Sequence, residues 1–171
     1  IDLIWTGPTS QQTNLRRTDQ ALIDLINSAK ERLLIVSFAV YKARSIMIAL
    51  ENAAQRGVDI KIILETESES EGKIAYDTIK ALGKSLKNKA SIFAWPLAKR
   101  GKTPNGKPGS LHAKVGVADG HCLYLSSANL TDYAMNVNME MGVLISGGDL
   151  PTRVEKHFIE LITNGTLAEQ N

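Results

Sequence analysis

The sequence lacks the residues on which several classes of protein depend. Its 171 residues include one cysteine, Cys122, which excludes an internal disulfide framework and a cysteine-based zinc cluster. A reducing compartment fits this cysteine usage, and we expect a cytoplasmic protein. No run of about 18 apolar residues occurs, so the sequence predicts no membrane span. Residues 1–5 have neither the basic nor the apolar stretch of a signal peptide.

Acidic residues are absent from residues 78–118, although the net charge of the whole chain is only +2. The same span holds nine of the twenty lysines and arginines: Lys80, Lys84, Lys87, Lys89, Lys99, Arg100, Lys102, Lys107 and Lys114. A basic block of this kind favours a polyanionic substrate such as nucleic acid. An ordinary lysine-rich surface in contact with solvent is the alternative.

The order of apolar segments predicts a single α/β domain that covers residues 1–171. Strands are expected at residues 3–6, 33–40, 58–64 and 90–95, separated by helices that begin near residues 18 and 45 and span 74–82. A hairpin at 112–118 and 122–125, a strand at 139–145 and a helix from residue 150 follow. This order is typical of a mixed, largely parallel central sheet with helices on both faces.

Residues 97–111 form a long segment in which glycine and proline alternate with lysine and arginine. Loops of more than about 12 residues inside a compact domain usually have a function or are disordered. We therefore take its basic residues as candidate substrate-binding residues: Lys99, Arg100, Lys102 and Lys107.

The residues best suited to chemistry lie within 112–140. On a strand, His112 and Lys114 would share one face. A neutral imidazole can act as nucleophile or base, and an adjacent ammonium can hold a phosphate oxygen. Asn129 offers an amide to a second oxygen, and Glu140 could accept a hydrogen bond from the far ring nitrogen of the histidine. Asp119, at the end of the strand, suits a turn cap better than chemistry.

Three motifs in this region resemble the signature of the phospholipase D superfamily: His112-Ala113-Lys114 followed by Asp119, Ser127-Ala128-Asn129, and Asn138-Met139-Glu140. Ser127, Asp119 and Asn138 are its supporting residues here. Ser126 departs from the pattern, because superfamily members often have glycine there. More narrowly, stretches such as 5–8, 36–39 and 127–131 are similar to the phospholipase D-like component of the DISARM anti-phage defence system.

The resemblance implies a phospholipase D-like fold and a reaction that needs no metal or other cofactor. One histidine attacks phosphorus to form a phosphohistidine, and a histidine from a second motif protonates the leaving oxygen. Since this chain has one such motif, a complete site implies a homodimer in which each copy supplies His112. His121 and His157 are weaker candidates for the second histidine within one chain, because a turn and a structural helix position are expected there.

We therefore expect a metal-independent phosphodiesterase, a nuclease that cleaves DNA in anti-phage defence, with other defence subunits as further partners and no membrane association. The basic block and the basic 97–111 segment favour nucleic acid over lipid. One alternative is a non-catalytic nucleic-acid-binding or assembly subunit of a defence complex. The other is an enzyme that hydrolyses phospholipids.

Overall fold

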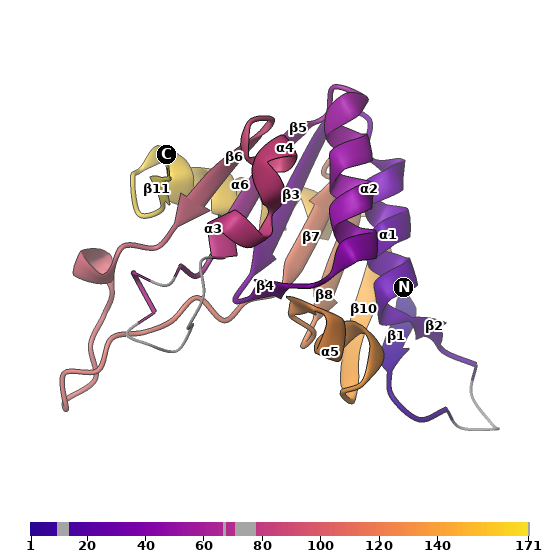
Figure 1. Ribbon diagram of the computed structural model, residues 1–171, viewed down its shortest axis with the longest axis horizontal. Coiled ribbons are helices and arrows are strands. Elements are labelled where there is room, and N and C mark those ends of the chain that lie inside the picture. Colours follow the sequence, from indigo (N-terminus) through magenta and orange to yellow (C-terminus); the bar gives the residue numbers. More distant parts are fainter. Residues whose placement is uncertain (10–13, 67, 71–77, 171) are drawn as a thin grey trace.

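The computed structural model describes residues 1–9, 14–66, 68–70 and 78–170. Among these, strands form a large sheet in the order β11-β6-β5-β3-β7-β8-β10-β1-β2 (Figure 1). These strands are β1 (Asp2–Thr6), β2 (Arg16–Arg17), β3 (Arg32–Ser37), β5 (Asp59–Leu64), β6 (Ala90–Ala94), β7 (Val115–Ala118), β8 (Cys122–Ser126), β10 (Glu140–Ser146) and β11 (Ala168–Glu169). A second, two-stranded sheet pairs β4 (Val40–Tyr41) with β9 (Leu130–Thr131).

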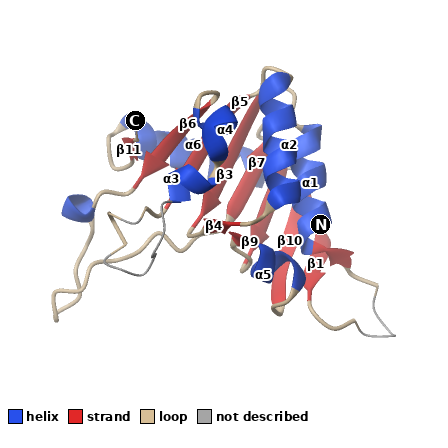
Figure 2. Ribbon diagram, in the orientation of Figure 1, coloured by secondary structure: helices blue, strands red, loops and turns tan. Residues whose placement is uncertain are grey.

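The helices lie on both faces of the large sheet (Figure 2). They are α1 (Thr18–Ser28), α2 (Arg44–Gln55), α3 (Thr78–Ala81), α4 (Gly83–Lys87), α5 (Asp132–Asn136) and α6 (Leu150–Thr163), with a 3-10 turn at Leu97–Lys99. None of the helices in the described part has the length and apolar character of a membrane span.

The predicted α/β class, with a mixed sheet and helices on both faces, is confirmed, but the parallel share of the sheet is smaller than expected. Among the described strands of the large sheet, parallel pairing is confined to β3-β5-β6 and to β1-β2. The β7–β8 hairpin is antiparallel, and so are its pairings on both sides: β7 with β3, and β8 with β10. Strand β10 is in turn antiparallel to β1. Crossover helices favour parallel neighbours, whereas the tight turn after β7 makes its neighbour antiparallel.

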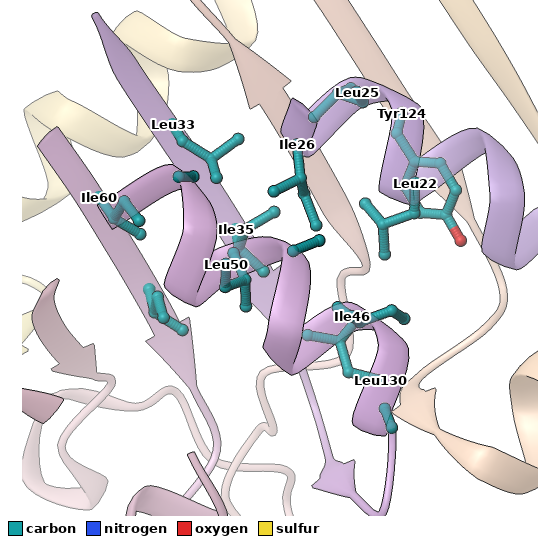
Figure 3. Close-up of a cluster of buried hydrophobic side chains, with 14 of the residues drawn as sticks. Leu22, Leu25, Ile26, Leu33, Ile35, Ile46, Leu50, Ile60, Tyr124 and Leu130 are labelled. Carbon is teal, nitrogen blue, oxygen red and sulfur yellow. The ribbon is translucent and has the colours of Figure 1, made fainter. Parts of the chain in front are cut away.

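Alternate residues of β3 divide the core into two layers. Leu33 and Ile35 face α1 and α2, as Figure 3 shows, whereas Leu34 and Val36 belong to the cluster on the α6 side. Because successive side chains of a strand point to opposite faces, the continuous apolar run in β3 reflects burial on both sides. These central strands therefore provide a rigid support for the loops at their ends.

Three predicted elements differ from the structure. The strand expected at 33–40 ends at Ser37, and Val40–Tyr41 form the separate strand β4. Of the helix expected at 74–82, residues 74–77 lie outside the described residues, and the remainder is the short helix α3 followed by Leu82. A separate short helix, α4, begins at Gly83 (φ +81°). The strand expected to begin at His112 begins at Val115 instead.

One edge of the sheet collects the segments that carry the candidate residues. Strands β3, β5, β8 and β1 end at this edge, while the antiparallel β7 and β10 begin there. In Figure 1 it is the lower edge, where the loops before β7 and β10 and the small β4–β9 sheet lie. This arrangement brings residues 112–114, 127–129 and 138–140 to one side of the molecule.

Candidate active site

His112 and Lys114 touch each other in the segment that leads into β7. Lys114 Nζ lies 2.9 Å from His112 Nδ1 and donates a 2.8 Å hydrogen bond to the His112 carbonyl oxygen. The Phe38 ring, just beyond β3, lies 5.5 Å from the imidazole between centroids. The prediction that the pair shares a strand face is wrong, because β7 starts after both residues. They meet because the lysine side chain folds back towards the histidine.

Lys114 is nearly buried, with 7% of the residue exposed, whereas His112 is exposed. Burial lowers the pKa of Lys114 below the ordinary lysine value, and the negative charge of Glu140 opposes part of that shift. The site thus combines an exposed imidazole with an ammonium that is poorly solvated.

Asn129 lies where the short loop after β8 meets the end of β3. The amide of Leu130, the next residue, donates to Ser37 Oγ at 3.2 Å and to the Ala39 carbonyl oxygen at 3.1 Å. Asn129 Oδ1 is buried without a hydrogen-bond partner. An unsatisfied buried polar atom costs free energy, so its presence at this edge agrees with a site whose bonding is completed by another molecule.

Glu140, the first residue of β10, is held by both residues predicted to support the site. Ser127 Oγ donates to Glu140 Oε2, and Asn138 Nδ2 donates to Glu140 Oε1 at 3.1 Å. Two further bonds join Ser127 to the main chain of Met141, at 3.1 and 3.2 Å. No hydrogen bond joins Glu140 to His112 among the described residues, so the expected contact is not made within one chain.

Asp119 lies at the opposite end of β7 and fastens a turn. Its carboxylate accepts hydrogen bonds from the amides of Lys30, Glu31 and Arg32, each at 2.9 Å. Burial alone would raise the pKa of Asp119, but these three donors, helped by the Arg32 charge, hold it below the ordinary value. The cap expected from the sequence is present, and it lies away from His112.

The basic 97–111 segment does not act as a single surface. Arg100, expected to bind substrate, is instead buried in an ion pair with Glu65, and only 6% of it is exposed. Its guanidinium donates hydrogen bonds to that carboxylate and to carbonyl oxygens, so it cannot reach a phosphate in solvent. Lys99 is exposed and donates to the Gly165 carbonyl oxygen, whereas Lys102 and Lys107 lie exposed in the loop that follows.

Sequence reasoning missed Glu65. Glu65 directly follows the apolar strand β5 and is fully buried. The available signal was its position, since an acid next to a buried strand needs a partner. The partner, Arg100, is 35 residues away in the sequence.

The other two histidines lie apart from the His112–Lys114 pair. His121 is exposed in the turn after β7, beside Asp119, and its amide donates to the Ala118 carbonyl oxygen. His157 lies on α6, with its ring 5.6 Å from the ring of Phe158. In the described part of the chain, no three His, Cys, Asp or Glu side chains gather as a metal-ligand group.

A family model described as "Cardiolipin synthase, PLD-like domain" matches residues 22–162 of this chain. The chain belongs to the phospholipase D-like family. The resemblance inferred from the three motifs is therefore confirmed, and a hydrolase of phosphodiesters is the enzyme class that agrees with this family.

Relatives of this phospholipase D-like chain include the DISARM protein DrmC of Bacillus paralicheniformis, 27% identical over 96% of this chain and 64% of the relative. Cardiolipin synthase A of Pseudomonas aeruginosa is 26% identical over 81% of this chain and 26% of the synthase. The chain thus spans less than two thirds of these relatives.

Two solved structures share the fold. Nuc from Salmonella typhimurium, a phospholipase D family member, superposes with a TM-score of 0.68 at 21% identity, over 99% of this chain and 96% of Nuc. NucT from Helicobacter pylori superposes with a TM-score of 0.72 at 24% identity, over 88% and 89% of the two chains.

Proposed function

We propose that this chain is a metal-independent phosphodiesterase that cleaves nucleic acid, DNA foremost, at a site shared by two copies. The observation that carries the proposal is the contact between His112 and Lys114, at the sheet edge where Asn129 and Glu140 also lie. An exposed imidazole can attack phosphorus, and the lysine and asparagine can offset the charge that develops on the phosphoryl oxygens.

The proposed reaction has two displacements at phosphorus. His112 of one copy attacks, the bond to the leaving oxygen breaks, and His112 of the second copy gives that oxygen a proton. Water then attacks the phosphohistidine and loses a proton to the second histidine, which restores both imidazoles. Glu140 would accept a ring N–H across the dimer and so fix the imidazole tautomer, a contact that is not made within one chain.

Exposed apolar side chains near Glu140 support the proposal that a second copy of the chain binds there. Met139 and Met141 flank the carboxylate, while Tyr133 and Val137 precede it, and all four are exposed, Met139 by 70% and Tyr133 by 67%. Contiguous exposed apolar side chains often mark protein interfaces. Burial of these side chains by a twofold partner would bring two copies of the His112 edge together.

Anti-phage defence is the setting we propose, with the cytoplasm as the compartment and other defence subunits as partners. The similarity to the DISARM protein DrmC supports this setting. Lys102 and Lys107, exposed beyond the pair, suit a nucleic-acid backbone. The cardiolipin synthase A relatives favour a lipid diester as the second candidate substrate.

The test compares the wild-type chain with His112→Ala on fluorescent DNA oligonucleotides in EDTA. We expect cleavage by wild type to persist in EDTA and the variant to lose at least about 10³-fold, because the nucleophile is gone. His157→Ala is the matched control and should cleave as wild type does.

Four results would contradict parts of this proposal. Activity that disappears with EDTA removes the metal-free mechanism, and a strictly monomeric mass in sedimentation removes the shared site. DNA binding without cleavage by wild type favours the non-catalytic binding subunit instead. Turnover of phosphatidylglycerol vesicles without DNA cleavage favours the lipid enzyme.

A further inference from the structure

We infer that Glu65 and Arg100 are positioning residues that hold His112 in its place for attack, a role that rests on the proposed function of the His112 edge. The pair lies behind the site rather than in it. Glu65 follows β5, and Arg100 follows the 3-10 turn at Leu97–Lys99. Neither side chain is exposed to substrate, so any effect on the reaction must pass through the residues that they contact.

The contacts of Arg100 saturate its guanidinium. Nη1 and Nη2 donate to the two carboxylate oxygens of Glu65 at 2.9 and 2.6 Å. Nε donates to the Trp95 carbonyl oxygen at 2.9 Å, and Nη1 also donates to the Gly109 carbonyl oxygen at 3.0 Å. The guanidinium also lies 5.3 Å from the Trp95 ring centroid. One side chain thus ties the end of β6 to the end of the following loop.

That loop, residues 101–109, is a closed unit that we call the finger. The amide of Gly109 donates to the Gly101 carbonyl oxygen at 3.0 Å, and Lys102 bridges Pro108 within it. In Figure 1 it extends beyond the lower edge of the sheet. Arg100, which precedes the finger, and Gly109, its last residue, are therefore joined both by the chain of the finger and by a side-chain hydrogen bond.

The same carboxylate reaches the residue before the nucleophile. The amide of Leu111 donates to Glu65 Oε2 at 3.0 Å, and the Leu111 side chain is buried in the core cluster on the α6 side. His112 follows directly, with Lys114 and Phe38 against its ring. Since the main chain of His112 is fixed on its N-terminal side by Leu111, the Glu65 carboxylate sets where the imidazole starts.

A buried ion pair is a poor way to stabilise a fold, because desolvation of two charges offsets most of their attraction. Replacement of both members by apolar residues is often neutral for stability. A pair retained only for stability would thus be replaceable. The backbone hydrogen bonds to Leu111 and Gly109, in contrast, are lost with the pair, and small displacements of a reacting group can cost about a hundredfold in rate.

The experiment uses the double variant Glu65→Met/Arg100→Met in the full chain, with Arg32→Met/Glu155→Met as control. The control removes an ion pair of 2.8 Å that joins β3 to α6 near Asp119. The substrates are a single-stranded DNA oligonucleotide and bis(4-nitrophenyl) phosphate. The second is too small to contact the finger while it is bound at the His112 edge. The ring resonances of His112, followed by NMR, report its position without any reaction.

We expect the double variant to fold with a lowered melting temperature, because the Leu111 amide and the Gly109 carbonyl oxygen lose their partners. At temperatures where it is folded, it should lose about 10- to 100-fold in kcat on both substrates, with KM for DNA changed less. Its His112 resonances should shift or broaden, whereas the control keeps both kcat and the resonances. If the folded double variant keeps the kcat of wild type, the pair has a purely structural role and the inference is overturned.

Two provisions keep the outcomes separate. If the double variant does not fold, Glu65→Gln preserves volume and one carbonyl oxygen, and an unchanged kcat in that variant also overturns the inference. If wild type cleaves neither substrate, the proposed function fails, and unmoved His112 resonances in the double variant would independently refute the positioning role.

Discussion

The two ends of strand β7 carry residues of the same motif, but the polar groups at the two ends differ in how fully they are hydrogen-bonded. At one end, His112 is exposed beside a nearly buried ammonium, and nearby Asn129 Oδ1 has no hydrogen-bond partner. At the other end, Asp119 accepts three backbone amides and adopts a left-handed conformation, φ +53°. Unsatisfied groups are a cost that a fold retains where another molecule binds, while saturated ones hold the fold together.

After the loss of His112 itself, the largest effect should come from Lys114, at the site end. Lys114→Met should lower kcat/KM by about 10²–10³-fold, because it removes the charge that offsets the developing oxyanion. The lowered pKa of Lys114 means that its proton leaves at a lower pH than from an ordinary lysine. Activity should therefore fall on the alkaline side as pH rises through that pKa. In Lys114→Arg the alkaline decline should disappear, because the guanidinium stays charged.

A pair of glycine substitutions compares the two ends in the main chain. A Cβ at Gly142 would lie 2.2 Å from the Leu125 carbonyl oxygen, so Gly142→Ala must part β10 from β8 and displace Glu140. A Cβ at Gly120 would meet the Glu155 side chain at 2.9 Å, which can move. We expect Gly142→Ala to lose about 2–4 kcal/mol of stability and most activity. Gly120→Ala should lose about 1–2 kcal/mol, with the activity of the folded protein unchanged, as thermal melts and rate assays can show.

Asp119→Asn should affect stability and leave the reaction alone. At neutral pH we expect a loss of about 1–3 kcal/mol, because the amides of residues 30–32 lose a charged acceptor. The folded-state pKa of Asp119 lies below its unfolded value, so its contribution is present above about pH 4 and disappears as pH falls through the folded value. Denaturant titrations at several pH values should show the gap to wild type closing in acid. A large loss of kcat in folded Asp119→Asn would contradict the assignment.

The smallest effect should come from the finger. Lys102→Gln/Lys107→Gln should raise KM for DNA about 3- to 10-fold at low salt and flatten its salt dependence, because two phosphate contacts are lost. Lys156→Gln, on α6, is the charge control. An equal rise in KM for the control would assign the effect to net charge rather than to the finger.

Much of the fold followed from local patterns in the sequence. Two of these patterns depend on near neighbours and appear in the structure: the apolar run that forms β3 and the Asp119–Gly120 turn between β7 and β8. The spacing within the three motifs is local in the same way. The extent of parallel pairing did not follow, because strand order depends on contacts between distant segments. Arg100 shows the same limit, since composition assigned it to a basic surface while its partner lies 35 residues away.

The contact between His112 and Lys114 shows how a correct expectation can follow from a wrong geometry. Their spacing suggested a shared strand face, yet β7 begins at Val115 and the meeting is made by a lysine side chain that folds back. The spacing of Ser127, Asn138 and Glu140 was informative in another way. Ser127 and Asn138 each donate a hydrogen bond to Glu140, so their motifs support the position of a carboxylate.

The closed base of the finger has a consequence for how such proteins diversify. Because Gly101 and Gly109 are joined by their own hydrogen bond, residues 102–108 can change in length and sequence without moving the chain on either side. Under the proposed function, the exposed lysines of the finger can therefore be replaced while the contacts that lead from Arg100 and Glu65 to Leu111 and His112 stay in place.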